Sequence, residues 1–149
     1  MQVVQEFSVR LVNKPGVLAG VMKALGRAKV NVVAMTLSDS DKRGVLRLVV
    51  TQTATAARVL RDLNVPVTQT DVLQAKLTNR PGAMGEVAGK LAQEHINITY
   101  AYCTSGASGG RTTGILKVEN LSKAMKVLGA EKVHKDGTAL RRSRASRKS

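Results

Sequence analysis

The chain has 149 residues, 43% of them hydrophobic, which is enough for one ordinary domain or two very small ones. One cysteine and two distant histidines exclude a disulfide scaffold and a structural zinc site, and we predict no metal or cofactor. The net charge of +14 favours an acidic partner, but one Phe, two Tyr and no Trp are too few for the stacking surface of a single-stranded nucleic-acid binder.

The first residues alternate between apolar and polar side chains, which predicts a strand over 3–12. They do not form the basic and then apolar segment of a targeting peptide, and no apolar run approaches the roughly 18 residues of a membrane span. We therefore expect a soluble, cytoplasmic protein.

The next elements follow from hydrophobic periodicity. Leu18, Val21, Met22, Leu25 and Ala28 recur at helical spacing, so a helix with one buried stripe is predicted there. A β-branched strand begins at Asn31, and residues 45–50 alternate like a third strand. A second helix is predicted over 54–63 and a short strand over 65–70.

The chain then repeats this pattern. Residues 11–32 align without a gap onto 77–98, at an offset of 66. We align 43–50 with 113–120, at an offset of 70, which predicts a glycine-rich, mobile loop four residues longer in the second copy. In that copy the first strand is predicted over 72–78, the second begins at 97, the third contains 115–118 and the last lies at 132–135. Its two helices are predicted over 84–91 and 122–130.

The order βαββαβ, present twice, predicts an α+β fold of two ferredoxin-like repeats. Their boundaries are 1–68 and 69–135, and the basic residues 136–149 are predicted to be a disordered tail. A unit of this size is marginal alone, so the repeats should pack together through sheet edges or helical faces, and the pair should dimerise. The tail is either a solubilising extension or an anchor for RNA, DNA or an acidic partner enzyme.

The junction of first strand and first helix carries the candidate site. A helix N-terminus presents unpaired amides and a partial positive charge, which suit a carboxylate. Proline fits the first helical turn, and glycine lets the backbone come close to another group. The asparagine of this turn either caps the helix or holds a ligand. A second asparagine follows eighteen residues later and either holds a ligand or caps the loop after the helix. The candidate residues are Asn13, Lys14, Pro15, Gly16, Val17, Leu18 and Asn31 in the first copy, and Asn79, Arg80, Pro81, Gly82, Ala83, Met84 and Asn97 in the second.

These residues resemble the ACT domain, a small-molecule-sensing module of amino-acid metabolism. The resemblance covers residues 1 to about 135, which look like two such domains in tandem. In detail these residues are similar to the serine-binding domain of bacterial phosphoglycerate dehydrogenase. The resemblance implies composite ligand sites in which Asn13 meets Asn97, and Asn79 meets Asn31. Leu11 and Leu77 replace a histidine of the serine-binding domain, which puts serine in doubt and favours an apolar ligand such as a branched amino acid or methionine.

No acid, base or nucleophile has a partner at useful spacing, so we predict that the protein is not an enzyme. Cys103 is interpreted as a core or surface thiol, and the glycines of 106–114 join two strands instead of feeding a phosphate-binding helix. The function predicted from the sequence is that of a regulatory protein that binds a free amino acid between domains. The alternatives are a basic nucleic-acid-binding protein and a regulatory subunit of an amino-acid biosynthetic enzyme.

Overall fold

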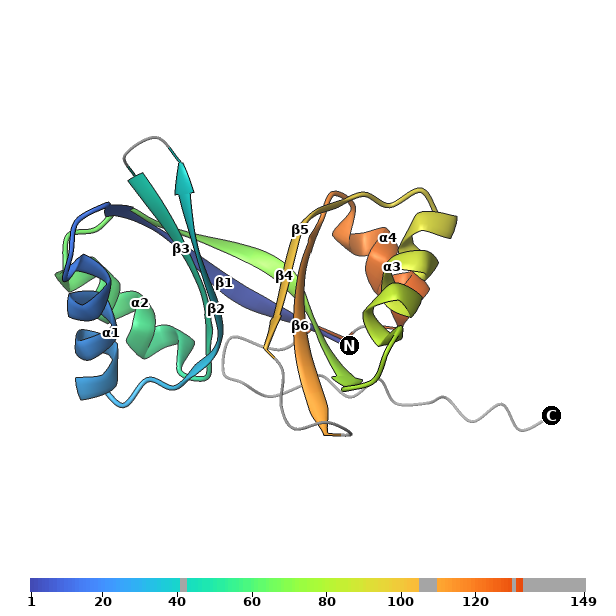
Figure 1. Ribbon diagram of the computed structural model, residues 1–149, viewed down its shortest axis with the longest axis horizontal. Coiled ribbons are helices and arrows are strands. Elements are labelled where there is room, and N and C mark those ends of the chain that lie inside the picture. Colours follow the sequence, from blue (N-terminus) through green and yellow to red (C-terminus); the bar gives the residue numbers. More distant parts are fainter. Residues whose placement is uncertain (41–42, 105–109, 130, 133–149) are drawn as a thin grey trace.

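The computed structural model describes residues 1–40, 43–104, 110–129 and 131–132. The chain is an α+β protein with two halves, each carrying a pair of helices on its outer side (Figure 1). This confirms the predicted class and the tandem ferredoxin-like repeat. The long glycine-rich loop and the tail lie mainly or wholly outside the described residues. The elements are β1 (Gln2–Val12), α1 (Val17–Arg27), β2 (Val32–Ser40), β3 (Arg43–Val50), α2 (Thr53–Asp62), β4 (Val67–Thr78), α3 (Ala83–Gln93), β5 (Ile98–Thr104), β6 (Arg111–Val118), α4 (Leu121–Leu128) and β7 (Glu131–Lys132).

One sheet runs through both halves, in the order β2-β3-β1-β4-β6-β5, with β7 paired to β1. The halves join where β1 and β4 pair antiparallel, which confirms the prediction that the repeats pack through sheet edges. Packing through the helical faces is wrong, because both helix pairs lie on the outside of the molecule (Figure 1). The strands expected over 65–70 and 72–78 are one continuous strand, β4, so the predicted boundary after residue 68 falls inside it.

The pairing of β1 with β4 is symmetrical about one residue pair. Gln5 lies opposite Asp71, and these two residues are equivalent at the offset of 66. Their side chains also hydrogen-bond, with the Gln5 amide donating to the Asp71 carboxylate. A local twofold axis therefore passes between them, and each strand crosses from one half into the other.

Each long strand contributes to both hydrophobic cores. Phe7 and Val9 of β1 are buried in the first core, whereas Val3 is buried in the second together with Leu73 of β4. In exchange, Val67 at the start of β4 packs against the first core. Because burying one such side chain contributes about 1.5–3 kcal/mol, neither half keeps its full core without the strand from the other.

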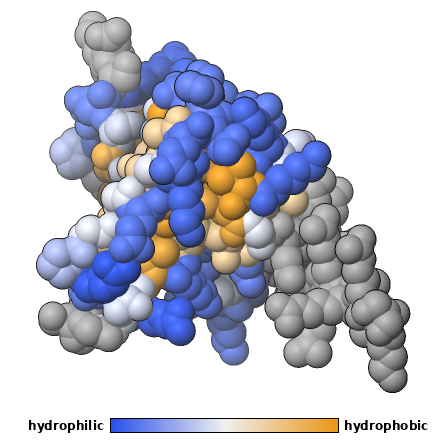
Figure 2. Space-filling view, turned by 90° about the vertical axis from the view of Figure 1, so that its right-hand side faces the viewer, coloured by the Kyte–Doolittle hydropathy of each residue, from blue (hydrophilic) through white to orange (hydrophobic). Residues whose placement is uncertain are grey.

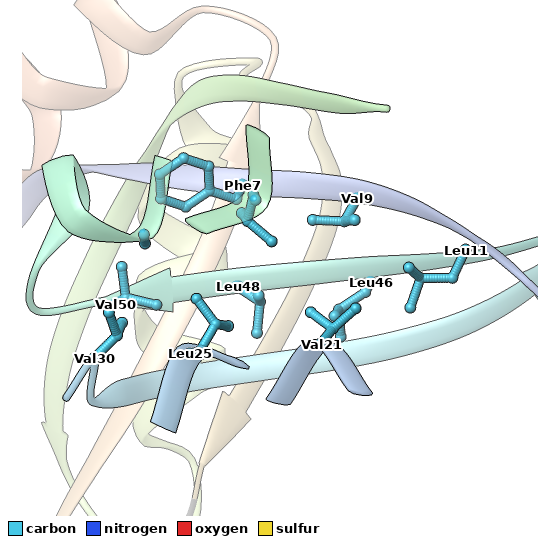
Figure 3. Close-up of a cluster of buried hydrophobic side chains, with 11 residues drawn as sticks. Phe7, Val9, Leu11, Val21, Leu25, Val30, Leu46, Leu48 and Val50 are labelled. Carbon is cyan, nitrogen blue, oxygen red and sulfur yellow. The ribbon is translucent and has the colours of Figure 1, made fainter. Parts of the chain in front are cut away.

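The first core lies between the sheet and α1 (Figure 3). Val21 and Leu25 point from α1 toward Leu46 and Leu48 of β3, as the helical spacing predicts. In the second half Val87 and Leu91 of α3 occupy the same positions against Leu116 of β6. The buried stripe of the first helix is therefore confirmed in both copies.

The predicted offset of 70 between the third strands is wrong by two residues. Leu48 lies opposite Phe7 in the first half, and Leu116 lies opposite Leu73 in the second. Since Phe7 and Leu73 differ by 66, Leu48 corresponds to Leu116 and the structural offset is 68 instead of 70. The sequence alignment matched Gly44 to Gly114, but cross-strand pairing matches Gly44 to Thr112.

The faces of the sheet that carry no helices approach each other, and they enclose a polar cluster. Glu6 on β1 is fully buried there and accepts hydrogen bonds from the hydroxyls of Tyr100 and Tyr102 on β5, the second at 2.7 Å. The guanidinium of Arg47 on β3 stacks over the Tyr100 ring, 4.1 Å from its centroid. Ala34, Val49, Val72 and Ile115 form the buried apolar surroundings. A single carboxylate thus links strands of both halves.

This cluster predicts a loss of stability at alkaline pH. Burial, and then the neighbouring Glu6, raise the pKa of Tyr100 from 10.0 to about 12 and also raise the pKa of Tyr102. Because the tyrosine pKa is higher in the folded state than in the unfolded chain, the protonated hydroxyls stabilise the fold at pH values below 10. This stabilisation is lost as the pH rises from 10 through 12. Denaturant unfolding at several pH values should show a smaller alkaline decrease in the variant with Tyr100→Phe and Tyr102→Phe.

The other ionisable groups are common to both proteins, so their effects cancel in this comparison. At neutral pH the double variant should be less stable by about 1–3 kcal/mol, because the buried Glu6 carboxylate loses two donors. An equal alkaline decrease in both proteins would contradict the assignment.

Candidate functional site

The turn between β1 and α1 is a type II β-turn. The Val17 amide donates to the Lys14 carbonyl at 3.3 Å, and Gly16 has φ 85° and ψ −13°, close to the third position of that turn. Pro15 takes the second position, where its fixed φ is favourable, so it lies before the helix instead of in the first helical turn as predicted. Arg80, Pro81, Gly82 and Ala83 repeat the geometry in the second half, with a bond of 3.4 Å and φ 84°.

This turn limits which amides are available to a ligand. Gly16 is the N-cap of α1 and no side chain caps the helix, so the interpretation of Asn13 as a cap is wrong. The turn bond uses the Val17 amide, and the first helical bond runs from the Gly20 amide to the Gly16 carbonyl at 2.9 Å. The amides of Leu18 and Ala19 lie between these two bonds, at the positive end of the helix.

A hollow of about 200 Å³ opens beside this turn in the first half. Its walls come from the end of β1, the start of α1 and the neighbouring ends of β2 and β3, and they combine apolar side chains with one acid and one base. The lining residues are Leu11, Val12, Asn13, Lys14, Val17, Leu18, Leu37, Ser38, Asp39 and Gly44. Since pockets for drug-sized ligands start at about 300 Å³, this hollow fits a smaller molecule.

Asp39 gives the hollow its negative charge. The side-chain amide of Asn13 donates to the Asp39 carboxylate across 3.4 Å, joining the first turn to the end of β2. Val12 and Leu37 line the hollow although 56% and 49% of their surfaces are exposed. The site therefore presents a carboxylate, a lysine and exposed apolar surface within one hollow.

The second half has a hollow of different chemistry. It lies beside the β4–α3 turn, has a volume of about 290 Å³, and includes Met1, the residue before β1. Its walls carry four basic side chains, whereas Glu86 is its one acidic side chain and pairs with Arg80 at 2.8 Å. The basic residues are Lys76, Arg80, Lys90 and Arg111. Figure 2, seen from the side of this half, shows hydrophilic side chains around an apolar strip.

The second asparagines lie where β2 and β5 begin. The Asn31 carbonyl accepts from the Thr51 amide at 3.0 Å, and the Asn97 carbonyl accepts from the Glu119 amide at 3.1 Å. The Asn97 side chain also donates to the Glu119 carboxylate at 3.1 Å. Backbone bonds from Val30 and Ile96 to Leu25 and Leu91 close the helix ends, so we assign the asparagine side chains no capping role there.

The composite asparagine pairs do not come together within one chain. The turn that holds Asn13 and the start of β5, which follows Asn97, lie in different halves and are well separated in Figure 1. The turn after β4, with Asn79, is likewise separated from the start of β2, which follows Asn31. These pairs can therefore meet only between two chains.

Sequence reasoning missed Asp39 and Gly44. Both line the first hollow from strand ends that lie far along the chain from the turn motif. The repeat gave no signal for them, because the strand containing Gly44 was aligned at the wrong offset. Cys103 is an exposed free thiol.

The described part of the chain offers neither a metal site nor a membrane-spanning helix. Within it, no group of three or more His, Cys, Asp or Glu side chains is arranged to hold a metal ion. None of the helices in the described ranges is long and apolar enough to span a membrane.

Residues 1–136 match the family described as an ACT domain pair, and the chain belongs to that family. Domains of this kind have regulatory, ligand-binding roles instead of catalytic ones. No curated protein sequence matches the chain.

Several solved structures share the fold. A protein from Bacteroides thetaiotaomicron is 29% identical, with a TM-score of 0.79 and coverage of 86% of this chain and 88% of that one. The ligand-free regulatory subunit of aspartate kinase from Thermus thermophilus is 15% identical, with a TM-score of 0.62 and coverage of 87% and 92%. The corresponding subunit from Thermus flavus is 16% identical, with a TM-score of 0.53 and coverage of 87% and 95%.

The turn geometry predicts opposite effects for two glycine substitutions in the same half. Gly16→Ala places a side chain in a left-handed conformation and should lower the free energy of unfolding by about 1–2 kcal/mol. Gly20→Ala lies inside α1, where an added Cβ meets nothing within 4 Å, and should raise it by about 0.5–1 kcal/mol. Denaturant unfolding measures both, and equal effects would contradict the turn assignment.

Proposed function

We propose that the chain is a non-catalytic regulatory protein that binds a free amino acid in the hollow of its first half. The observation that carries this proposal is the combination, in one small hollow, of Asp39, Lys14 and the start of α1. A free amino acid carries one positive and one negative group on the same carbon atom, and this hollow presents partners for both.

The two charged groups of the ligand have distinct partners in this arrangement. The carboxylate binds toward the amides of Leu18 and Ala19, where the helix end is positive and Lys14 is near. The ammonium group binds the Asp39 carboxylate, which Asn13 already contacts. Leu11, Leu18 and Leu37 then contact the ligand side chain, which supports an apolar amino acid such as a branched one or methionine.

We also propose that the protein acts as a homodimer. Because Asn13 and Asn97 lie apart in one chain, Asn97 of a second copy would complete the composite site. Ligand binding would then stabilise the contact between the two chains and report amino-acid supply to a partner enzyme. The resemblance of the fold to regulatory subunits of aspartate kinase supports an enzyme as that partner. The similarity to a serine-binding domain stays a prediction, and Leu11 argues against serine itself.

A thermal-shift panel of the twenty common amino acids tests the function. An amino acid present at 100 times its dissociation constant should stabilise the fold by about 2.7 kcal/mol, and the midpoint should rise by roughly 2 to 8 °C. Asp39→Asn should abolish most of this shift, because it removes the charge that pairs with the ammonium group. Asp62→Asn changes an exposed carboxylate at the end of α2 and should preserve the shift.

Asn97→Ala separates the composite site from a site built by one chain. Loss of the shift in this variant supports a contribution from a second copy, and a full shift restricts the site to the first hollow. If no amino acid shifts the midpoint of the unmodified protein, the proposed function is wrong.

Binding of a nucleic acid through a basic surface is the second candidate function. The hollow of the second half supports it, since four basic side chains surround one acid that is already paired. A nucleic acid would bind such a surface mainly through its phosphates, with an affinity that falls steeply as salt rises. Fluorescence anisotropy with a labelled oligonucleotide should show weaker binding for Lys90→Ala and Arg111→Ala together. Equal binding by this variant would exclude the hollow as the contact.

A further inference from the structure

The two halves differ at three structurally equivalent positions beside the site. Gly44 and Thr112 correspond, because they lie opposite Leu11 and its equivalent Leu77. Leu46 and Gly114 correspond in the same way, since they lie opposite Val9 and Ala75. Leu18 and Met84 are equivalent positions at the start of α1 and α3. Each pair exchanges a small residue for a larger one or changes the shape of the side chain.

In the first half, Leu46 fills the space under α1. It is fully buried and lies with Leu11 and Val21 in the core (Figure 3). Leu18 packs at the edge of this core and lines the hollow, where Gly44 contributes no side chain. The room beside the turn therefore stays open.

In the second half, Met84 takes the space that Leu46 fills in the first. Gly114 has no side chain, and the Met84 Cε atom lies 2.8 Å from the position that a Cβ on Gly114 would take. Thr112 brings a side chain to the position of Gly44, and its Oγ1 is buried without a hydrogen-bond partner among the described residues. The hollow of this half shares with the first the positions of Leu77, Thr78, Arg80 and Ala83, but it extends along α3 to Lys90, and neither Met84 nor Thr112 lines it.

The rim of the site also changes its chemistry. The exposed apolar pair Val12 and Leu37 is replaced by Thr78 and Cys103. At the offset of 66, the residue that corresponds to Asp39 in the sequence is Ser105, so the second repeat has no carboxylate at this position. Shape and charge therefore differ together.

We infer that each chain binds one amino acid instead of two, and that Gly44 is the residue that determines which half binds. This inference rests on the proposed function. The absence of a side chain at Gly44 keeps the first hollow open, and the first half alone has Asp39 for an ammonium group. In the second half Thr112 and Met84 occupy the equivalent space, so that repeat does not bind an amino acid beside its own turn.

Gly44→Thr tests the inference by giving the first half the residue of the second. Gly44 does not adopt a positive φ, and threonine suits a strand, so the variant should fold. A Cβ at this position would approach the Leu37 Cδ1 atom at 3.3 Å, the flexible end of a side chain. The rest of the threonine side chain would then enter the hollow. Gly20→Ala is the matched control, because it adds a methyl group to the same half in open space.

Equilibrium dialysis against an equimolar mixture of the twenty amino acids, followed by analysis of the bound fraction, measures the stoichiometry. The unmodified chain and Gly20→Ala should each bind one amino acid per chain. Binding by Gly44→Thr should weaken by about tenfold or more, as expected when a filled site is overpacked. Two amino acids per unmodified chain, or undiminished binding by folded Gly44→Thr, would overturn the inference and leave the proposed function intact.

A second measurement does not depend on the variant. In the unmodified protein labelled at its methionine methyl groups, the Met84 signal should stay unchanged when the amino-acid mixture saturates binding. A shifted Met84 signal would overturn the inference, because it would place a ligand in the second half. No binding by any of the three proteins would reject the proposed function, and this inference with it.

Discussion

The antiparallel pairing of β1 with β4 is the interaction on which the rest of the structure depends. It is centred on Gln5 and Asp71, which are equivalent residues of the two repeats, so it relates the halves by a local twofold axis. Both strands continue past this axis and bury residues such as Val3 and Val67 in the opposite core. A unit of this size is only marginally stable alone, and the exchanged strands supply each half with apolar side chains from the other repeat. The halves are therefore expected to fold and unfold together.

The same pairing brings the two helix-free faces of the sheet toward each other and explains the buried carboxylate. Glu6 lies one residue from the symmetry pair, where it reaches Tyr100 and Tyr102 of the other half. Burying a charge is costly unless donors satisfy it, and two tyrosine hydroxyls and nearby Arg47 supply that compensation. The cluster ties the relative placement of the halves to a specific set of polar contacts.

A rigid, symmetrical framework makes the asymmetry of the two turns informative. Both turns have the same backbone, with proline and a left-handed glycine at the same places. The residues around them have diverged, so one half has a small hollow with opposite charges and the other has a basic hollow around Arg80. A duplicated module can in this way keep one copy for a ligand and use the other for support or for a different partner.

Much of this protein was determined by its sequence alone, because the information was local. The helix stripe of Val21 and Leu25, the repeated turn at Gly16 and Gly82, and the order of elements other than the two strands merged in β4 follow from periodicity and turn chemistry, and the structure confirms them. Only the tertiary structure decided that β4 is one strand shared by both cores, and that Gly44 corresponds to Thr112. It also decided that Asp39 lies beside Asn13. Pairing between strands sets these relations across long stretches of chain, and neither periodicity nor a gapped alignment of one sequence contains that register.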